Sequence, residues 1–326
     1  MMRIFSGIQP TGVIHIGNYC GALKQWVELQ KNNECLFCIV DLHALTSEFN
    51  PENLQELILE KAIAYLSAGI DPKKSIIYVQ SHIKEHTELA WLLNTITPIG
   101  DLTRMTQYKE KARKFKKNLN AGLLNYPILM SADILLYQTE IVPVGKDQKQ
   151  HVELTRTIAR KFNQKFGETF KIPNAFLPKH GAKIMSLTEP RKKMSKSDKP
   201  ESYIGLFDKP EIIEKKIITS ITDSGKEIIY NPEKKPGISN LLTIYSLFSE
   251  KSIKSLEKEF EGKGYSSFKN SLAVLIKEKL EPFRKKKKEL LSKKNSIKKI
   301  LDNGKKRAHA MAIPTIKKAR KKMGLT

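Results

Sequence analysis

Short apolar runs alternate with helical patterns over the first hundred residues of this 326-residue chain. The runs "RIFSGIQ", "CLFCIVD" and "SIIYVQ" are typical of buried strands, and "NYCGALKQWVELQKN" between the first two has the spacing of a helix. A second helix is predicted from Pro51, with Asn50 as its N-cap, to Gly69, and "TELAWLLNTIT" predicts a third that ends before Pro98. This alternation predicts a parallel sheet with helices on both faces.

The pattern changes twice after residue 100. Residues 100–121 are polar and lysine-rich and indicate an insertion, which is followed by a helix, "YPILMSADILLYQ", a strand, "IVPVG", and another helix, "QKQHVELTRTIARKFN". From Lys209 onward the pattern is mainly helical and charged. We therefore predict an α/β fold with a Rossmann-like nucleotide-binding domain over residues 1–200, which contains an inserted connecting segment near 100–180. A helical, basic domain over 201–326 follows it.

Charge is strongly unbalanced along the chain. There are 58 Lys and Arg against 34 Asp and Glu, a formal net charge of +24. Residues 281–326 hold seventeen Lys/Arg against three acidic residues, Glu281, Glu289 and Asp302. Such a field attracts polyanions in a salt-dependent way, so we expect a nucleic-acid partner. A lysine-rich proteome is the alternative explanation.

The sequence gives little reason to expect a membrane or a metal. No run approaches the roughly 20 apolar residues that span a bilayer, and no basic-then-apolar signal segment opens the chain, so we expect a cytoplasmic protein. Cys35 and Cys38 form Cys-x-x-Cys without a second pair at metal spacing, which favours buried thiols over zinc. His82 and His86 lack a third ligand, so we interpret them as structural and predict no protein-bound metal.

The stretch "SGIQPTGVIHIGNY" places a glycine-rich turn between the first strand and the first helix. In a parallel sheet this crevice is where nucleotides bind. Gly12 lets the backbone turn, Gly17 leaves room for a ligand, and His15 and Asn18 can donate hydrogen bonds to phosphate. The common glycine signatures of phosphate loops are missing, so this stretch alone is also consistent with an ordinary turn.

A second motif, "KKMSKS", lies about 180 residues further on and carries Lys193 and Lys196. Alone it is a basic loop, but the two motifs together resemble the His-Ile-Gly-His and Lys-Met-Ser-Lys-Ser signatures of class I aminoacyl-tRNA synthetases. Over nearly its whole length the chain is similar to bacterial-type tryptophanyl-tRNA synthetases, in "FSGIQPTGVIHIGNYCGAL", "CIVDLHALT", "LTRMTQYKEK", "YPILMSADILLYQTEIVPVGKDQKQHVELTR", "KIMSLTEPRKKMSKSD" and "KPGISNLL". Asn18 replaces the second histidine of the wider class, as is common in the tryptophan branch.

The resemblance implies a homodimer that activates tryptophan with ATP and Mg²⁺ and transfers it to tRNA(Trp). By resemblance the catalytic residues are His15, Asn18, Lys193, Lys196 and Lys111, although an ordinary surface lysine is the alternative for the last. The ATP-binding residues implied are Gln9, Pro10, Thr11, Gly17, Asn18, Gly145, Lys146, Asp147, Ile184, Lys193, Met194, Ser195, Lys196 and Ser197.

Asp133 is a carboxylate inside the otherwise apolar run "ILMSADILLY", where burial without a partner would be costly. The resemblance implies that it accepts the indole N–H, the one polar group of a tryptophan side chain, which is only a donor; a satisfied core aspartate is the alternative. The other tryptophan-binding residues implied are Phe5, Gln9, His43, Tyr126, Met130, Val142, Val144 and Gln148. Ordinary core packing competes for the apolar ones.

Three other functions share some of these sequence features. A tyrosine-specific relative shares the fold and both signatures, although "GIQPTG" and "DLHALT" speak against it. A non-catalytic nucleic-acid-binding protein would explain the charge but not the two nucleotide motifs. A small-molecule nucleotidyltransferase uses a similar histidine-containing turn without needing the long basic region.

Overall fold

Five parallel strands form the centre of the α/β fold, in the spatial order β3-β2-β1-β4-β5. Their bounds are β1 (Arg3–Ile8), β2 (Glu34–Ile39), β3 (Ser75–Val79), β4 (Ile141–Pro143) and β5 (Asn174–Phe176). β1 and β2 pair in parallel from Arg3 opposite Glu34 to Ile8 opposite Ile39. Apolar strands of this kind suit a sheet covered on both faces. The predicted fold class is confirmed, but β5 was not predicted.

The computed structural model describes residues 1–46, 49–114, 120–177, 183–196 and 198–325. The chain divides into two compact units. Unit 1 consists of Met1–Thr11, Trp26–Lys179 and Lys294–Thr326, and unit 2 of Gly12–Gln25 and His180–Lys293. This grouping is not the division near residue 200 that the sequence suggested. The two strands β4 and β5 of the segment near 100–180 belong to the sheet of unit 1. The last helix, residues 294–322, is also part of unit 1.

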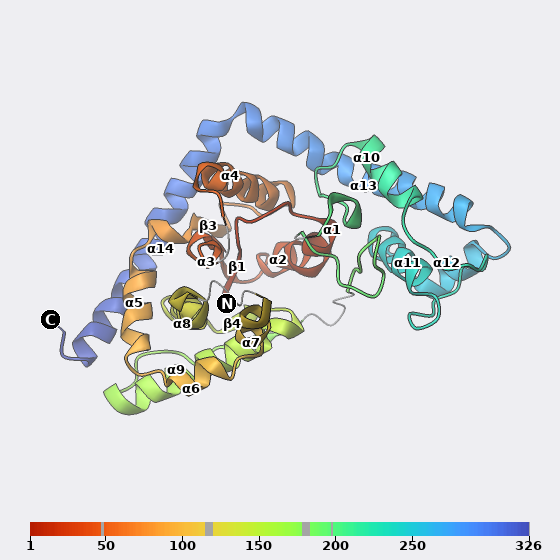
Figure 1. Ribbon diagram of the computed structural model, residues 1–326. Coiled ribbons are helices and arrows are strands. Elements are labelled where there is room, and N and C mark those ends of the chain that lie inside the picture. Colours follow the sequence, from red (N-terminus) through yellow and green to blue (C-terminus); the bar gives the residue numbers. More distant parts are fainter. Residues whose placement is uncertain (47–48, 115–119, 178–182, 197, 326) are drawn as a thin grey trace. The chain divides into compact units, whose positions relative to one another are not determined.

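Helices surround the sheet of unit 1 (Figure 1). They are α3 (Asp41–Ala44), α4 (Pro51–Ser67), α5 (Glu85–Asn94), α6 (Ile99–Thr103), α7 (Thr106–Lys114), α8 (Ala121–Leu135), α9 (Lys149–Phe166) and α14 (Lys294–Lys322), with 3-10 turns at Gln80–His82 and Lys146–Gln148. The predicted start of α4 is confirmed, because the Asn50 side chain accepts a hydrogen bond from the Glu52 N–H and Pro51 opens the helix. Its end near Gly69, where φ is +101°, is confirmed too.

Unit 2 is mainly helical. It contains α1 (Ile16–Asn18), a π-helical turn (Tyr19–Leu23), a 3-10 turn (Pro200–Ser202), α10 (Pro210–Ile218), α11 (Pro236–Ser249), α12 (Ile253–Glu259) and α13 (Tyr265–Ser292), while α2 (Lys24–Leu29) spans the boundary at Gln25. Among the described helices of both units, none is both long enough and apolar enough to cross a bilayer.

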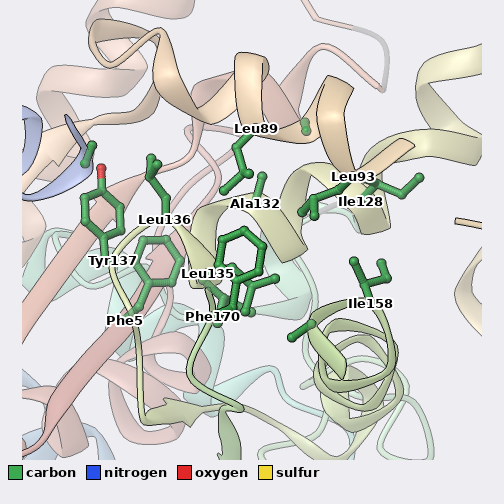
Figure 2. Close-up of a cluster of buried hydrophobic side chains, with 14 of the residues drawn as sticks. Phe5, Leu89, Leu93, Ile128, Ala132, Leu135, Leu136, Tyr137, Ile158 and Phe170 are labelled. Carbon is green, nitrogen blue, oxygen red and sulfur yellow. The ribbon is translucent and has the colours of Figure 1, made fainter. Parts of the chain in front are cut away.

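An apolar cluster lies in unit 1, where α5, α8 and α9 meet the sheet (Figure 2). Phe5 of β1 stacks on Tyr137 with ring centroids 6.0 Å apart, and Leu89, Ala132 and Ile158 fill the helix interfaces. The cysteines Cys35 and Cys38 are buried on β2 as free thiols, as predicted. α8 is therefore anchored in the core along its apolar side, which fixes any polar residue that it carries.

The last helix, α14, packs directly on the edge strand β3. A Cβ placed on Gly304 would lie 1.8 Å from the carbonyl oxygen of Ile77, so only glycine allows this approach. Arg307 donates hydrogen bonds to the carbonyls of Pro72 and Ser75 at 3.1 and 3.2 Å. The helix covers an edge that would otherwise offer unpaired backbone groups.

We expect Gly304→Ala to lower the free energy of unfolding of unit 1 by about 2 kcal/mol, because the added methyl group forces α14 away from β3. Denaturant unfolding followed by circular dichroism measures this change. Asn303→Ala, at the neighbouring exposed position of α14, is the control and should change stability by less than about 0.5 kcal/mol. Equal stability of the two variants would show that the contact does not anchor the helix.

Candidate active site

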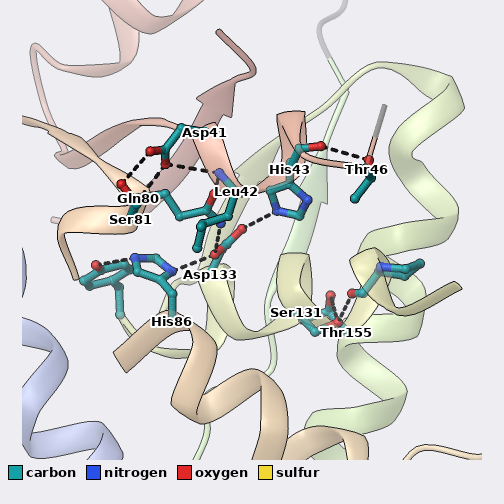
Figure 3. Close-up of polar contacts among 12 residues, drawn as sticks. Asp41, Leu42, His43, Thr46, Gln80, Ser81, His86, Ser131, Asp133 and Thr155 are labelled. Atoms are coloured by element: carbon teal, nitrogen blue, oxygen red, sulfur yellow. Dashed lines mark hydrogen bonds and ion pairs between the residues drawn. The ribbon is translucent and has the colours of Figure 1, made fainter. Parts of the chain in front are cut away.

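Asp133 lies on α8 and is 1% exposed. Its Oδ1 accepts hydrogen bonds from Gln80 Nε2 at 2.7 Å and His86 Nδ1 at 2.6 Å, and its Oδ2 accepts one from His43 Nε2 at 2.7 Å (Figure 3). The backbone N–H of Leu42 donates to Gln80 Oε1, which turns the amide nitrogen toward the carboxylate. Burial alone would raise the pKa of Asp133, but the hydrogen bonds from His43 and His86 hold it well below the usual range.

Other residues predicted for the tryptophan pocket also lie in unit 1. The Tyr126 ring lies edge-on to His43 at 6.4 Å, and its hydroxyl is 2.9 Å from His151 Nε2. Burial raises the pKa of Tyr126 to about 12, so the hydroxyl stays protonated. Phe5 and Val142 are buried in the apolar cluster, and Met130 and Val144 pack against it half-buried. The structure therefore links His43 and Tyr126 to Asp133 through direct contacts and places the apolar members of the predicted set in the core of the same unit.

Two further groups of predicted residues in unit 1 follow adjacent parallel strands. Gln9, Pro10 and Thr11 come directly after β1. Gly145, Lys146, Asp147 and Gln148 follow Val144, just after the end of β4, which pairs with β1. The Gln148 amide donates to Asp147 Oδ2 at 3.0 Å. Because parallel strands end at the same edge of the sheet, both groups lie where nucleotides bind in such folds.

The sequence did not connect Asp133 with three residues that hold it directly or through a neighbour. Gln80 follows β3 directly, and its polar character at a strand end was the available signal. His86 was predicted to be structural and is buried against Asp133, whereas His82 is exposed. Tyr137 reaches His86 with its hydroxyl. These partners are distant in sequence, so no local pattern connects them.

In unit 2, His15 caps the short helix α1. Its Nδ1 accepts a hydrogen bond from the Gly17 N–H at 3.1 Å, and its own backbone N–H donates to Asn18 Oδ1 at 3.1 Å. Burial, and then the charges of Lys196 and Lys193, lower the pKa of His15 to about 4. At neutral pH the ring is therefore neutral, with its proton on Nε2, and the Asn18 amide nitrogen can still donate.

The "KKMSKS" segment belongs to the same unit as His15. Met194 is buried and its N–H donates to the carbonyl of Ile184, while Lys193 pairs with Met185 in an antiparallel bridge. A Cβ placed on Gly12 would lie 3.0 Å from Lys196 Cδ, so the lysine stem lies against the turn before His15. The two signature motifs are thus neighbours within unit 2.

A strand-like segment after this loop holds the His15 turn in place. The Ile16 N–H donates to the carbonyl of Ile204, and His15 forms an antiparallel bridge with Gly205. Asp208 accepts from the Gly205 N–H at 2.8 Å and from Lys216 Nζ at 2.7 Å. This explains how a three-residue helix keeps a defined position.

Two of the predicted site residues are not fully described by the structure. The side chain of Lys111, on α7, and the whole of Ser197 are outside the described residues. Within the described part of the chain, no group of three or more His, Cys, Asp or Glu side chains is placed to hold a metal ion.

The fold and these two motifs define a class I aminoacyl-tRNA synthetase. The family model for class I tRNA synthetases (W and Y) matches residues 1–281, and the chain belongs to this family. The tryptophan–tRNA ligase of Caldanaerobacter subterraneus is 51% identical over 326 residues, which cover 100% of this chain and 99% of the relative. That of Bacillus anthracis is 50% identical over 100% of this chain and 99% of the relative.

Solved structures agree with this assignment. Tryptophanyl-tRNA synthetase from Mycoplasma pneumoniae is 35% identical with a TM-score of 0.91, over 100% of this chain and 98% of that one. The Campylobacter jejuni enzyme complexed with ADP and tryptophan is 40% identical with a TM-score of 0.87, over 99% and 100%. A tyrosyl-tRNA synthetase from Archaeoglobus fulgidus, 19% identical with a TM-score of 0.70 over 88% and 90%, shares the fold alone. The resemblance found in the sequence is confirmed.

Proposed function

We propose that the protein is a tryptophan–tRNA ligase. It activates L-tryptophan with ATP to give tryptophanyl-adenylate and pyrophosphate, and then transfers tryptophan to the 3′ end of tRNA(Trp). The observation that carries this proposal is the buried Asp133 carboxylate, an acceptor-only group that suits the indole N–H donor. The full-length similarity to tryptophan-specific relatives supports the same choice over tyrosine.

The first step needs alignment and positive charge more than acid–base catalysis. The tryptophan carboxylate is already ionised at neutral pH, so it attacks the α-phosphate of ATP without a general base. The bond to pyrophosphate breaks as negative charge increases on the phosphate oxygens. Lys193 and Lys196 stabilise this charge, and His15, kept neutral by its low pKa, and Asn18 donate hydrogen bonds to it. ATP enters as its Mg²⁺ complex.

ATP/pyrophosphate exchange tests the proposal directly. The purified protein is assayed with tryptophan and with tyrosine in parallel, both without tRNA. Exchange with tryptophan alone is the expected result. Exchange with tyrosine would move the assignment to the tyrosine branch, and exchange with neither would leave a nucleic-acid-binding protein without this activity.

The basic C-terminal region is proposed to bind the tRNA. The protein is proposed to act in the cytoplasm. Because residues 281–326 carry seventeen Lys/Arg against three acidic residues, we expect affinity for tRNA(Trp) to fall roughly tenfold or more between 50 and 200 mM salt. Filter binding across this range measures the change, and tRNA-independent exchange is the control, which should vary far less. An affinity that does not respond to salt would contradict the assignment of this region.

A homodimer is part of the proposal. Trp91 on α5 and Ile99 on α6 are 68% and 70% exposed, and large exposed apolar side chains often mark an interface. We expect light scattering to give twice the chain mass of 37.2 kDa, and Trp91→Lys with Ile99→Lys to shift it toward the monomer. Lys84→Ala, at an exposed position just before α5, is the control. An unaffected dimer in the double variant would place the interface elsewhere.

A further inference from the structure

His86 is held by hydrogen bonds at both ring nitrogens. Nδ1 is 2.6 Å from Asp133 Oδ1, and Nε2 is 2.9 Å from the Tyr137 hydroxyl and 3.2 Å from the Tyr78 hydroxyl. All four residues are at most 1% exposed. They come from β3, α5, α8 and the residues directly after α8, so the contact joins separate elements of unit 1.

The protonation pattern of this group follows from its chemistry. The pKa of Asp133 is well below its usual range, so the carboxylate is ionised and can only accept. Nδ1 of His86 must therefore carry the proton of that hydrogen bond. Burial raises the pKa of Tyr78 and Tyr137 well above the usual value, so both hydroxyls stay protonated. The single lone pair of Nε2 accepts from one of them, and the Tyr137 hydroxyl is the nearer at 2.9 Å. The imidazole is fixed in one orientation from both sides.

The two oxygens of Asp133 are used unequally. Oδ1 accepts from Gln80 and His86, whereas Oδ2 accepts from His43 alone. A carboxylate has about four lone-pair positions, two on each oxygen. Oδ2 can therefore accept one more hydrogen bond. The two donors on Oδ1 fix the rotation of the carboxylate and so the direction in which Oδ2 points.

We propose that His86 is a positioning residue for amino-acid specificity, which turns Asp133 so that Oδ2 receives the indole N–H of tryptophan. This inference rests on the proposed function. His86 itself does not touch the substrate; it acts by occupying Oδ1 and by resisting rotation of the carboxylate. Without it, Asp133 keeps its charge but loses the orientation that selects an N–H donor.

The test compares tryptophan with an analogue in which sulfur replaces the indole N–H, benzothiophenyl-alanine, in ATP/pyrophosphate exchange. The unaltered protein should favour tryptophan by a large factor in kcat/KM, on the order of 10³ or more, because the analogue leaves a buried acceptor unpaired. In His86→Leu we expect this preference to fall at least about tenfold, chiefly through a higher KM for tryptophan, with the analogue nearly unaffected.

Three variants separate positioning from simple structural support. His86→Asn places an amide N–H where Nδ1 stood and should restore most of the preference, whereas His86→Gln carries its amide near the Nε2 position and should not. His82→Leu, at the exposed histidine of the same segment, is the control. If His86→Leu does not fold, the comparison of Asn with Gln decides the question.

Equal loss of kcat/KM for tryptophan and the analogue in the His86 variants would overturn the inference, since that result describes a structural residue. An unchanged preference in all of them would overturn it as well. If the unaltered protein exchanges with no amino acid, the proposed function fails and this inference fails with it. If the unaltered protein exchanges with tryptophan but the His86 variants lose kcat/KM equally for tryptophan and the analogue, only the positioning role is contradicted and the proposed function stands.

Discussion

Lys196→Ala is expected to slow formation of tryptophanyl-adenylate by about 10²–10³-fold while the affinity for tryptophan changes less than about twofold. The reason is that Lys196 is proposed to supply positive charge to phosphate oxygens only as the transition state forms, whereas the residues proposed for the tryptophan pocket belong to unit 1. The charge of Lys196 already lowers the pKa of His15, and its stem lies against Gly12. It is therefore close to the turn proposed to bind phosphate.

Single-turnover formation of the adenylate measures the rate, and equilibrium dialysis measures tryptophan affinity. Lys199→Ala is the matched control, because Lys199 is an exposed lysine three positions further along the same segment. It should keep nearly full activity. A proportional fall of rate and affinity in Lys196→Ala would contradict the role in the transition state and indicate a damaged fold.

The sequence predicted the parts of the fold that depend on neighbouring residues. β2 and β3 are mainly apolar runs, β1 has a shorter apolar stretch before a glycine-rich turn, and the start of α4 has a side-chain cap from Asn50 followed by a proline. The strand β5 was not predicted because it has only three residues, begins with Asn174 and is ordered through pairing with β4. Such pairing is a tertiary effect that local propensity does not report.

The last helix illustrates the same limit at the level of domains. A run of Lys and Arg at the end of the chain suggested that residues 201–326 form one basic domain, yet α14 belongs to unit 1. The contact that decides this is between Gly304 and the backbone of Ile77, two residues far apart in sequence. Charge describes what a surface attracts, but close packing determines which elements fold together.

The sequence predicted the site residues that lie in recognisable motifs, but not the residues that reach the site only through tertiary contacts. The signatures around His15 and Lys196 lie in one unit, and Asp133 is buried as expected. The neutral state of His15 was not predicted, because burial and the neighbouring lysines that lower its pKa become visible only in the structure. The same holds for Gln80 and His86, which occupy one oxygen of Asp133.

Asp133→Asn is expected to reduce kcat/KM for tryptophan by about 10³-fold or more, because the new amide nitrogen would face a donor. Two donors, Gln80 and His86, require an oxygen at the Oδ1 position, so the amide oxygen takes that place and the NH₂ group takes the place of Oδ2. There it meets His43 and the proposed position of the indole N–H. ATP/pyrophosphate exchange with tryptophan measures the loss, and Asp302→Asn, at an exposed position on α14, is the control.

The same substitution should also remove a pH dependence of stability. The pKa of Asp133 is below its usual value of 3.8 in the folded protein, so the ionised carboxylate stabilises the fold above that pH, and the contribution is lost as pH falls further. Unfolding at several pH values between about 5 and about 2 should therefore show a flatter profile for Asp133→Asn than for the unaltered protein. Identical profiles together with full activity would mean that Asp133 neither carries a buried charge nor selects tryptophan, and the pocket would have to be sought around another acceptor.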